Sequence, residues 1–132
     1  MGFLKRLLGI CRTTPPADPD CWKPGDGKIE VNLAQAVELG KPGAAIRLEG
    51  SGLDDRVLVL KAEDGAFHAF VNKCTHAGRR LDPLPGAPLV ECCSVGKSRF
   101  DYSGERLSGS AKKAIRPLQV EEQEGKLIIS LA

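Results

Sequence analysis

Short apolar segments separated by turn sequences fill the chain from residue 28 onwards, and this spacing limits the folds open to it. Ile29, Val31 and Leu33 alternate with polar residues, which predicts a half-buried strand. Further strands are expected at 45–48, 57–60, 66–71, 89–93, 100–102, 105–107, 118–121 and 126–131. The 15 Gly and nine Pro supply turns, and no segment between the strands predicts a helix. The sequence therefore predicts an all-β fold, a small sandwich or partly closed barrel.

The chain divides near residue 27 into an N-terminal arm (1–27) and a β domain (28–132). The arm begins with an amphipathic segment, Phe3–Cys11, and continues into a proline-rich stretch at 13–20 that excludes regular helix and paired strand. The apolar face of the amphipathic segment consists of Leu4, Leu7, Leu8 and Cys11. Because so short a helix is marginal alone, we expect it to dock on its own domain or a partner, with a membrane surface as the alternative.

Charge and composition exclude several classes of function. The chain has 19 Lys and Arg against 17 acidic residues, so it lacks the strong basic excess of a nucleic-acid binder. No apolar stretch is long enough to span a membrane, and the N-terminus lacks the apolar run of a signal peptide, which predicts a cytoplasmic protein. The five Cys are then expected to be reduced thiols or metal ligands rather than a disulfide framework.

Two cysteine-containing segments follow expected strands and carry the chemistry of the chain. Cys74 and His76 stand two residues apart in the first segment, and Cys92 and Cys93 begin the second. Thiolate and imidazole are ligands for zinc and iron, so two neighbouring loops that present them can hold one metal centre. The pattern predicts metal binding by Cys74, His76 and Cys93. Nothing in the sequence indicates a substrate pocket beside a nucleophile, so no stand-alone enzyme activity is expected.

These segments resemble the ligand loops of the Rieske [2Fe–2S] family, in which Cys-x-His is followed by Cys-x-x-His and then by a Phe-Asp pair. Cys74, His76 and Cys93 match three ligand positions, and Phe100-Asp101 matches the trailing pair. The resemblance covers roughly residues 28–131 and implies a Rieske-type fold. It also implies a [2Fe–2S] cluster with two Cys on one iron and two His on the other. The function implied is that of a small electron carrier between partner proteins.

The fourth ligand position of this resemblance falls on Gly96, which has no side chain to offer. Cys92 is the nearest substitute, although a neighbour of Cys93 in a strand is expected to point to the opposite face, toward the core. The other candidate substitutes are Cys11 and Cys21, which would reach the loops from the arm.

Other outcomes for the two loops stay open at this point. One is a cluster-free Rieske-fold binding or regulatory subunit, like the small subunit of assimilatory nitrite reductase. Another is one zinc or iron ion in a tetrahedral site of three Cys and one His. A further outcome is a reversible disulfide between Cys74 and Cys93. His68 lies within an expected strand and is not expected to reach the loops.

Basic residues surround both loops. They are Arg79, Arg80, Lys97, Arg99, Lys112 and Lys113. Positive charge gathered at one end of a domain whose net charge is only +2 predicts a docking surface for an acidic redox partner or an anionic ligand. Solvated loop residues without a partner are the plain alternative.

Overall fold

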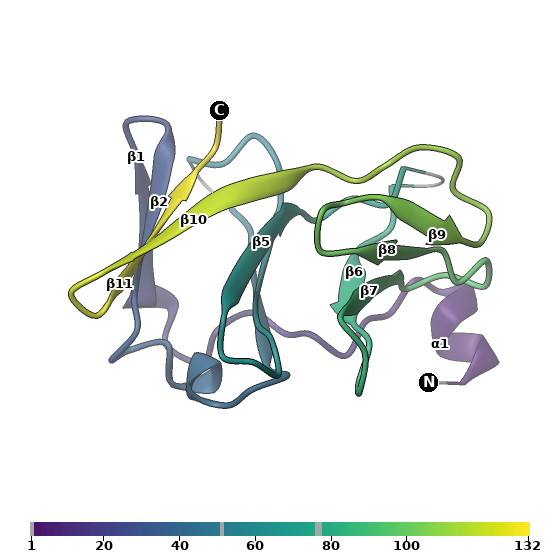
Figure 1. Cartoon of the computed structure of the whole chain (residues 1–132), viewed down its shortest axis with the longest axis horizontal. Coiled ribbons are helices and arrows are strands. Elements are labelled where there is room, and N and C mark those ends of the chain that lie inside the picture. The colour runs from purple at the N-terminus through teal and green to yellow at the C-terminus, as the bar shows by residue number, and fades with distance from the viewer. Residues whose placement is uncertain (1, 51, 76–77) are drawn as a thin grey trace.

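The computed structural model describes residues 2–50, 52–75 and 78–132, which form two antiparallel β-sheets and one short N-terminal α-helix (Figure 1). The larger, curled sheet contains β1 (Trp22–Gly25), β2 (Lys28–Asn32), β3 (Ala45–Leu48), β4 (Val57–Lys61), β5 (Phe67–Val71), β10 (Pro117–Gln123) and β11 (Lys126–Ser130). Its strands lie in the order β1-β2-β11-β10-β5-β4-β3. The smaller sheet contains β6 (Leu81–Pro83), β7 (Leu89–Cys92), β8 (Arg99–Asp101) and β9 (Arg106–Ser108), in that order. The predicted all-β fold is confirmed.

Strand β4 has buried side chains on both of its faces. Val57 and Val59 face the interior of the curled sheet, whereas Leu58 and Leu60 face a second core that the two sheets share. None of the four is more than 1% exposed. Because both faces are covered, the strand is apolar without interruption instead of alternating with polar residues.

The buried side chains form two core clusters, one on each side of the central strands. The first cluster fills the curled sheet and includes Ile29, Val31, Ile46, Leu48, Leu127 and Ile129. The second cluster lies between the two sheets and includes Phe70, Cys74, Leu81, Val90, Cys92 and Phe100. Two of the cysteines singled out in the sequence are therefore part of the core that joins the sheets.

Three connections between strands lie close to Cys74, Cys92 and Cys93. The first loop (residues 72–80) joins β5 to β6, the second loop (residues 93–98) joins β7 to β8, and a third segment (residues 109–116) joins β9 to β10. The third segment is hydrogen-bonded to both of the other two loops. Thr75 Oγ1 of the first loop donates to the Lys113 carbonyl at 2.6 Å, and the Ala111 N–H donates to Ser98 Oγ of the second loop at 2.8 Å.

The N-terminal arm differs from its prediction. Strand β1 lies before the boundary predicted near residue 27 and pairs with β2, which its proline permits because β1 is an edge strand. The 3-10 helices η1 (Pro19–Cys21) and η2 (Val37–Gly40) and the short strand β6 are also absent from the prediction.

Helix α1 (Phe3–Leu7) lies beside the smaller sheet but buries none of its residues (Figure 1). Leu4 is 66% exposed and Leu7 is 52% exposed. The apolar face of this helix is therefore not packed on its own domain, and its docking on a partner or a membrane surface stays a prediction. Among the described residues, no helix is long and apolar enough to cross a membrane.

Candidate functional site

Two buried thiols meet between the first and second loops. The side chains of Cys74 and Cys92 are hydrogen-bonded to each other, and each residue is only 1% exposed. Cys92 Sγ also lies 3.2 Å from Ser94 Oγ. The hydrogen bond with Cys74, together with burial, raises the pKa of Cys92 above its ordinary value. The Cys92 thiol is therefore protonated at neutral pH unless a metal cation displaces the proton.

Backbone hydrogen bonds hold both cysteines in position. The Cys74 N–H donates to the Arg79 carbonyl at 2.7 Å, and the Cys74 carbonyl accepts from the Gly78 N–H at 2.9 Å. Gly78 has a φ of 71°, which glycine adopts without the strain of a Cβ. On the other side, the Cys92 N–H donates to the Ser98 carbonyl at 2.8 Å. One thiol thus comes from a hydrogen-bonded turn and the other from the end of strand β7.

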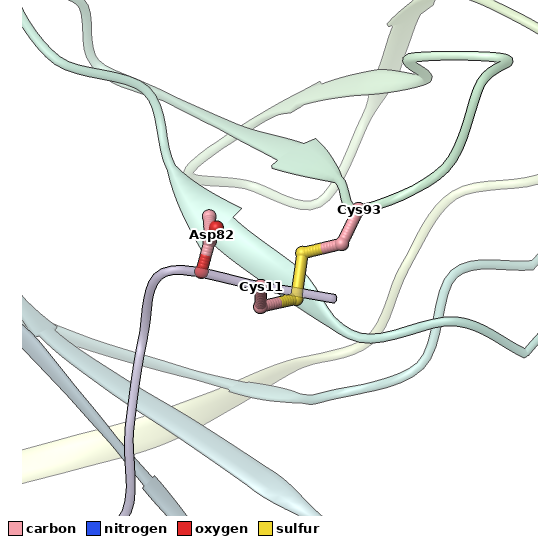
Figure 2. Close-up of side chains that lie close together, drawn as sticks. All are labelled: Cys11, Asp82 and Cys93. Atoms are coloured by element: carbon pink, nitrogen blue, oxygen red, sulfur yellow. A yellow bond between two sulfur atoms is a disulfide. The ribbon is translucent and has the colours of Figure 1, made fainter. Parts of the chain in front are cut away.

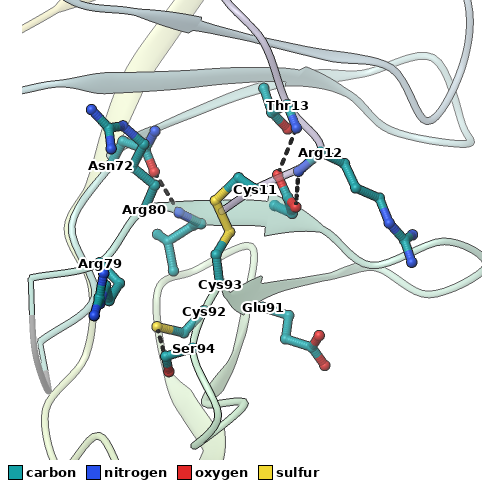
Figure 3. The surroundings of a disulfide bond; sticks show 12 residues. Cys11, Arg12, Thr13, Asn72, Arg79, Arg80, Glu91, Cys92, Cys93 and Ser94 are labelled. Carbon is teal, nitrogen blue, oxygen red and sulfur yellow. Dashed lines mark hydrogen bonds between the residues drawn. A yellow bond between two sulfur atoms is a disulfide. The ribbon is translucent and has the colours of Figure 1, made fainter. Parts of the chain in front are cut away.

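Cys93 points away from this thiol pair and forms a disulfide with Cys11 of the arm (Figure 3). The two Cα atoms are 5.4 Å apart although 82 positions separate them in the sequence. Consecutive residues at the end of β7 point to opposite sides, so Cys92 faces the core beside Cys74 while Cys93 faces the arm.

The disulfide corrects two expectations drawn from the sequence. A bond between Cys74 and Cys93 is wrong, because Cys93 is bonded to Cys11. The sequence, with five Cys and no export signal, predicted only reduced thiols or metal ligands. This prediction is also wrong, because two of the cysteines form a disulfide. The physical reason is that the arm returns to the second loop, which no local sequence pattern shows. In this bonded form, Cys93 is not available as a metal ligand.

The carboxylate of Asp82 lies next to the disulfide (Figure 2). Its Oδ2 accepts the Arg12 N–H at 2.8 Å and its Oδ1 accepts the Thr13 N–H at 3.0 Å. One ligand atom each from Cys11, Asp82 and Cys93 lie within 4.8 Å of one another. Sequence reasoning missed Asp82, because a single acidic residue in the short strand β6 carries no recognisable signal.

Arg6 attaches helix α1 to the second loop. Its Nη2 lies 2.6 Å from Glu91 Oε1, and Arg99 Nε lies 2.9 Å from Glu91 Oε2. Arg6 Nη1 donates to the carbonyls of Cys92 and Ser94, at 3.4 Å each. Burial disfavours the charged form of Glu91, but the hydrogen bonds from Arg6 and Arg99 outweigh burial and lower its pKa. The helix is therefore docked by a basic side chain and not by its apolar face.

The basic surface around the loops is smaller than the sequence suggested. Arg80 pairs with Glu49, with Nε 2.7 Å from Oε2, and Arg99 is engaged by the carboxylate that also holds helix α1. Arg79 donates to the Leu8 carbonyl at 3.0 Å and so supports the end of that helix. Exposed cations with no ion pair among the described residues include Lys97, Lys112 and Lys113.

A side chain at Gly96, the position where the resemblance expects the fourth ligand, would crowd the side chain of Ser110. A Cβ on Gly96 would lie 2.5 Å from Ser110 Oγ and 3.1 Å from Ser110 Cβ. His76 lies outside the described residues. His68 belongs to β5 and stacks on the Tyr102 ring, with the ring centroids 4.3 Å apart, so it is engaged away from the loops.

Cys21 is separated from the other cysteines by its place in the core. It belongs to the first core cluster, whereas Cys74 and Cys92 belong to the second. Burial, reinforced by the negative charge of Glu38, raises the pKa of Cys21 to about 11. Of the two arm cysteines, the structure brings Cys11 and not Cys21 to the second loop.

The family model for the Rieske [2Fe-2S] domain matches residues 29–119, which is more than half of the chain and includes both loops. The chain belongs to the Rieske [2Fe–2S] domain family. No curated protein matches it.

Solved structures share the fold of this Rieske chain. The ferredoxin of carbazole 1,9a-dioxygenase from Nocardioides aromaticivorans IC177 is 23% identical with a TM-score of 0.60, over 76% of this chain and 96% of the ferredoxin. A chain in the complex of reduced oxygenase and oxidized ferredoxin in carbazole 1,9a-dioxygenase is 22% identical with a TM-score of 0.57, over 69% and 83% of the two chains. These likenesses show the fold, and the predicted Rieske-type fold is confirmed.

A larger enzyme contains the same fold as one part of its chain. The quaternary ammonium Rieske monooxygenase CntA in complex with L-carnitine is 23% identical with a TM-score of 0.55. The match covers 73% of the present chain but only 30% of the monooxygenase chain. The chain therefore spans less than a third of that enzyme.

The described residues fit one half of the ligand set of a Rieske cluster. Such a cluster has two thiolates on one iron and two imidazoles on the other. Cys74 and Cys92 fit the thiolate half, because two loops present them side by side in a buried position. Gly96 offers no side chain for the imidazole half. The thiol beside Cys74 is Cys92, whereas the sequence pattern assigned that role to Cys93.

Proposed function

We propose that this chain is a small Rieske-type electron carrier whose [2Fe–2S] cluster is held by the thiolates of Cys74 and Cys92 and by His76. The observation that carries the proposal is the hydrogen-bonded pair of buried thiols between the first and second loops. When bound, a cluster of this kind takes up and releases single electrons. The pairing supports Cys92, rather than Cys93, as the second thiolate of the proposal.

The surroundings of the thiol pair suit a metal centre that is shielded from water. Leu81, Val90 and Phe100 belong to the same core cluster as Cys74 and Cys92, and all five are at most 1% exposed. The raised pKa of Cys92 means that metal binding must release its proton, so binding should strengthen as the pH rises. Burial also raises the energetic cost of leaving a charged thiolate without a cation.

We further propose that the end of the molecule carrying the loops docks on an acidic redox partner or an oxidoreductase subunit. Exposed lysines and the exposed apolar residues Leu4 and Leu7 of helix α1 offer a mixed basic and apolar surface. An apolar centre with charged surroundings is the usual anatomy of a protein interface. The complex of reduced oxygenase and oxidized ferredoxin in carbazole 1,9a-dioxygenase, one chain of which is similar to this one, supports this class of partner. The proposal includes a cytoplasmic location and no catalytic activity of the isolated chain.

The decisive experiment measures iron and acid-labile sulfide in protein produced and purified without oxygen, with an EPR spectrum after dithionite reduction. We expect equal amounts of iron and sulfide and the signal of a reduced cluster. Cys74→Ser and Cys92→Ser should each abolish the signal. Cys21→Ser is the matched control, because Cys21 is equally buried but lies in the other core cluster. A signal that survives Cys92→Ser contradicts the ligand assignment.

Two observations favour a second function, that of a cluster-free Rieske-fold binding or regulatory subunit. Gly96 offers no side chain at the fourth ligand position of the family, and Cys93 is bonded to Cys11. A folded protein with neither iron nor sulfide would support this second function and exclude the electron carrier. Zinc or iron without sulfide would instead indicate a mononuclear site with Cys and His ligands.

A further inference from the structure

We propose that Cys11, Cys93 and Asp82 form a separate site for a zinc-like divalent cation when the disulfide is reduced. The arm supplies Cys11, the second loop supplies Cys93 and strand β6 supplies Asp82 (Figure 2). This site shares no ligand with the thiol pair of Cys74 and Cys92. The inference rests on the proposed function in one respect, the assignment of Cys92 and not Cys93 to the cluster.

The positions of the three residues suit a tetrahedral metal ion. Their ligand atoms already lie within 4.8 Å of one another. Zinc takes thiolate sulfur at about 2.3 Å and carboxylate oxygen at about 2.0–2.2 Å, so two thiolates on one tetrahedral zinc lie roughly 3.8 Å apart. The Cα atoms of Cys11 and Cys93 are 5.4 Å apart. Side-chain rotation after reduction is therefore enough to place both sulfurs on one ion.

The carboxylate of Asp82 is held in the orientation that a metal ligand needs. The N–H groups of Arg12 and Thr13 each donate to one of its oxygens, at 2.8 and 3.0 Å. Ligating carboxylates are commonly fixed by such hydrogen bonds, which leave a lone pair on each oxygen for the ion. Because Arg12 directly follows Cys11, the same contact also positions the arm cysteine.

The charge around the site favours a divalent cation bound by two thiolates and one carboxylate. Those ligands carry three negative charges, and the ion leaves one of them uncompensated. Arg6 and Arg12 line a cavity of about 200 Å³ that also touches Asp82 and Cys93. Arg12, which has no ion pair among the described residues, can balance the remaining negative charge, whereas Arg6 is already paired with Glu91. The cavity gives the ion a route to the site and leaves room for water as a fourth ligand.

The conversion of the disulfide into a metal site takes two steps, reduction and then metal binding, and electrons and protons are conserved in each. A dithiol reductant of the thioredoxin class transfers two electrons and two protons to the Cys11–Cys93 disulfide and itself becomes a disulfide. The cation then replaces the two thiol protons, which pass to solvent, and accepts an oxygen of Asp82 as its third ligand. In both states, a bond through Cys93 keeps the arm attached to the second loop.

The test uses the full chain as isolated, with Co²⁺ as a coloured probe for zinc sites. Co²⁺ is titrated into protein reduced with a phosphine and into oxidised protein, and the thiolate-to-cobalt absorption is followed. We expect the band in reduced protein only, competed by Zn²⁺. Cys11→Ser should remove this band, whereas Cys21→Ser, at a buried cysteine of the other core cluster, should retain it. Asp82→Asn should weaken the affinity by about tenfold or more.

Alkylation of the unsubstituted, reduced protein provides a readout that does not depend on a variant that folds. Zn²⁺ should slow the alkylation of Cys11 and Cys93 together, as followed peptide by peptide by mass spectrometry. A cobalt band that survives Cys11→Ser, a band of equal strength in oxidised protein, or full reactivity of both cysteines in the presence of Zn²⁺ would each overturn the proposal.

Discussion

Arg6 Nη2 lies 2.6 Å from Glu91 Oε1 and joins helix α1 to strand β7 across 85 positions of the sequence. The two side chains are 12% and 8% exposed, so the pair is largely shielded from water. Arg99 binds the other oxygen of the same carboxylate. Together with the Cys11–Cys93 disulfide, this pair attaches the arm to the end of the molecule that carries the candidate metal centre.

Glu91→Gln is expected to destabilise the fold. The substitution keeps the shape of the side chain but leaves Arg6 without its counter-charge. We expect a loss of roughly 2 kcal/mol in the free energy of unfolding, less than for a fully buried pair because Arg99 is partly open to solvent. Urea unfolding measures the loss. Glu30→Gln is the control, because Glu30 pairs with two exposed lysines and the loss of stability should be far smaller. Equal losses would contradict the role given to Glu91.

Acid should weaken the same contact. The pKa of Glu91 is lowered in the folded state, so its ionisation contributes stability that is present above the ordinary carboxyl value of 4.5. That contribution is lost as the pH falls through the lower pKa of the folded state. The pKa of Glu49 is lowered as well, by its hydrogen bond from Arg80, and acts in the same direction. Unfolding measured from pH 7 to pH 3 should show a shallower decline for Glu91→Gln than for the unsubstituted chain.

Gly96→Ala should lower the free energy of unfolding, because Ser110 crowds the position of the fourth ligand. Its Cβ would approach Ser110 Oγ to 2.5 Å, so we expect a loss of about 1 kcal/mol on unfolding. In a Ser110→Gly background, the loss should shrink, because both contacting atoms of Ser110 are removed. The four proteins form a double-mutant cycle. A cost of Gly96→Ala that is identical in both backgrounds would show that Ser110 is not the obstacle.

Gly96→His combined with Ser110→Gly should supply an imidazole where the family pattern has its fourth ligand. If the electron-carrier proposal is correct, we expect more iron and sulfide per chain than in Ser110→Gly alone, because an incomplete ligand set is completed. Metal analysis and EPR of the two variants make the comparison. Equal metal contents would argue that the second loop does not point a side chain at the cluster from this position.

Cys21 should be the least reactive thiol of the arm. Its pKa of about 11, raised by burial first and by Glu38 second, leaves very little thiolate at neutral pH. We expect alkylation of Cys21 in folded, reduced protein to be far slower than alkylation of Cys11, and to equal it in urea. Peptide mapping after timed alkylation gives both rates. Rapid modification of Cys21 in the folded chain would contradict its burial.

Much of the fold could be read from local sequence. Strand β3 spans Ala45–Leu48, the range predicted, and β2, β4, β5, β7, β10 and β11 lie within two residues or so of their predicted ranges. This success has a local cause, since alternation and turn residues act over a few positions. The missed strands β1 and β6 are short and contain proline, so their pairing depends on a neighbouring strand that a local pattern does not show.

The cysteines mark the division between local and long-range information. The spacing of Cys74, His76 and the Cys92-Cys93 pair, which identifies the family, is a property of neighbouring residues and is visible in the sequence. Which cysteine meets which depends on where the first loop and the N-terminal arm lie relative to the end of β7. Cys92 meets Cys74, and Cys93 meets Cys11, because adjacent side chains at the end of β7 point to opposite sides and the arm crosses only one of them.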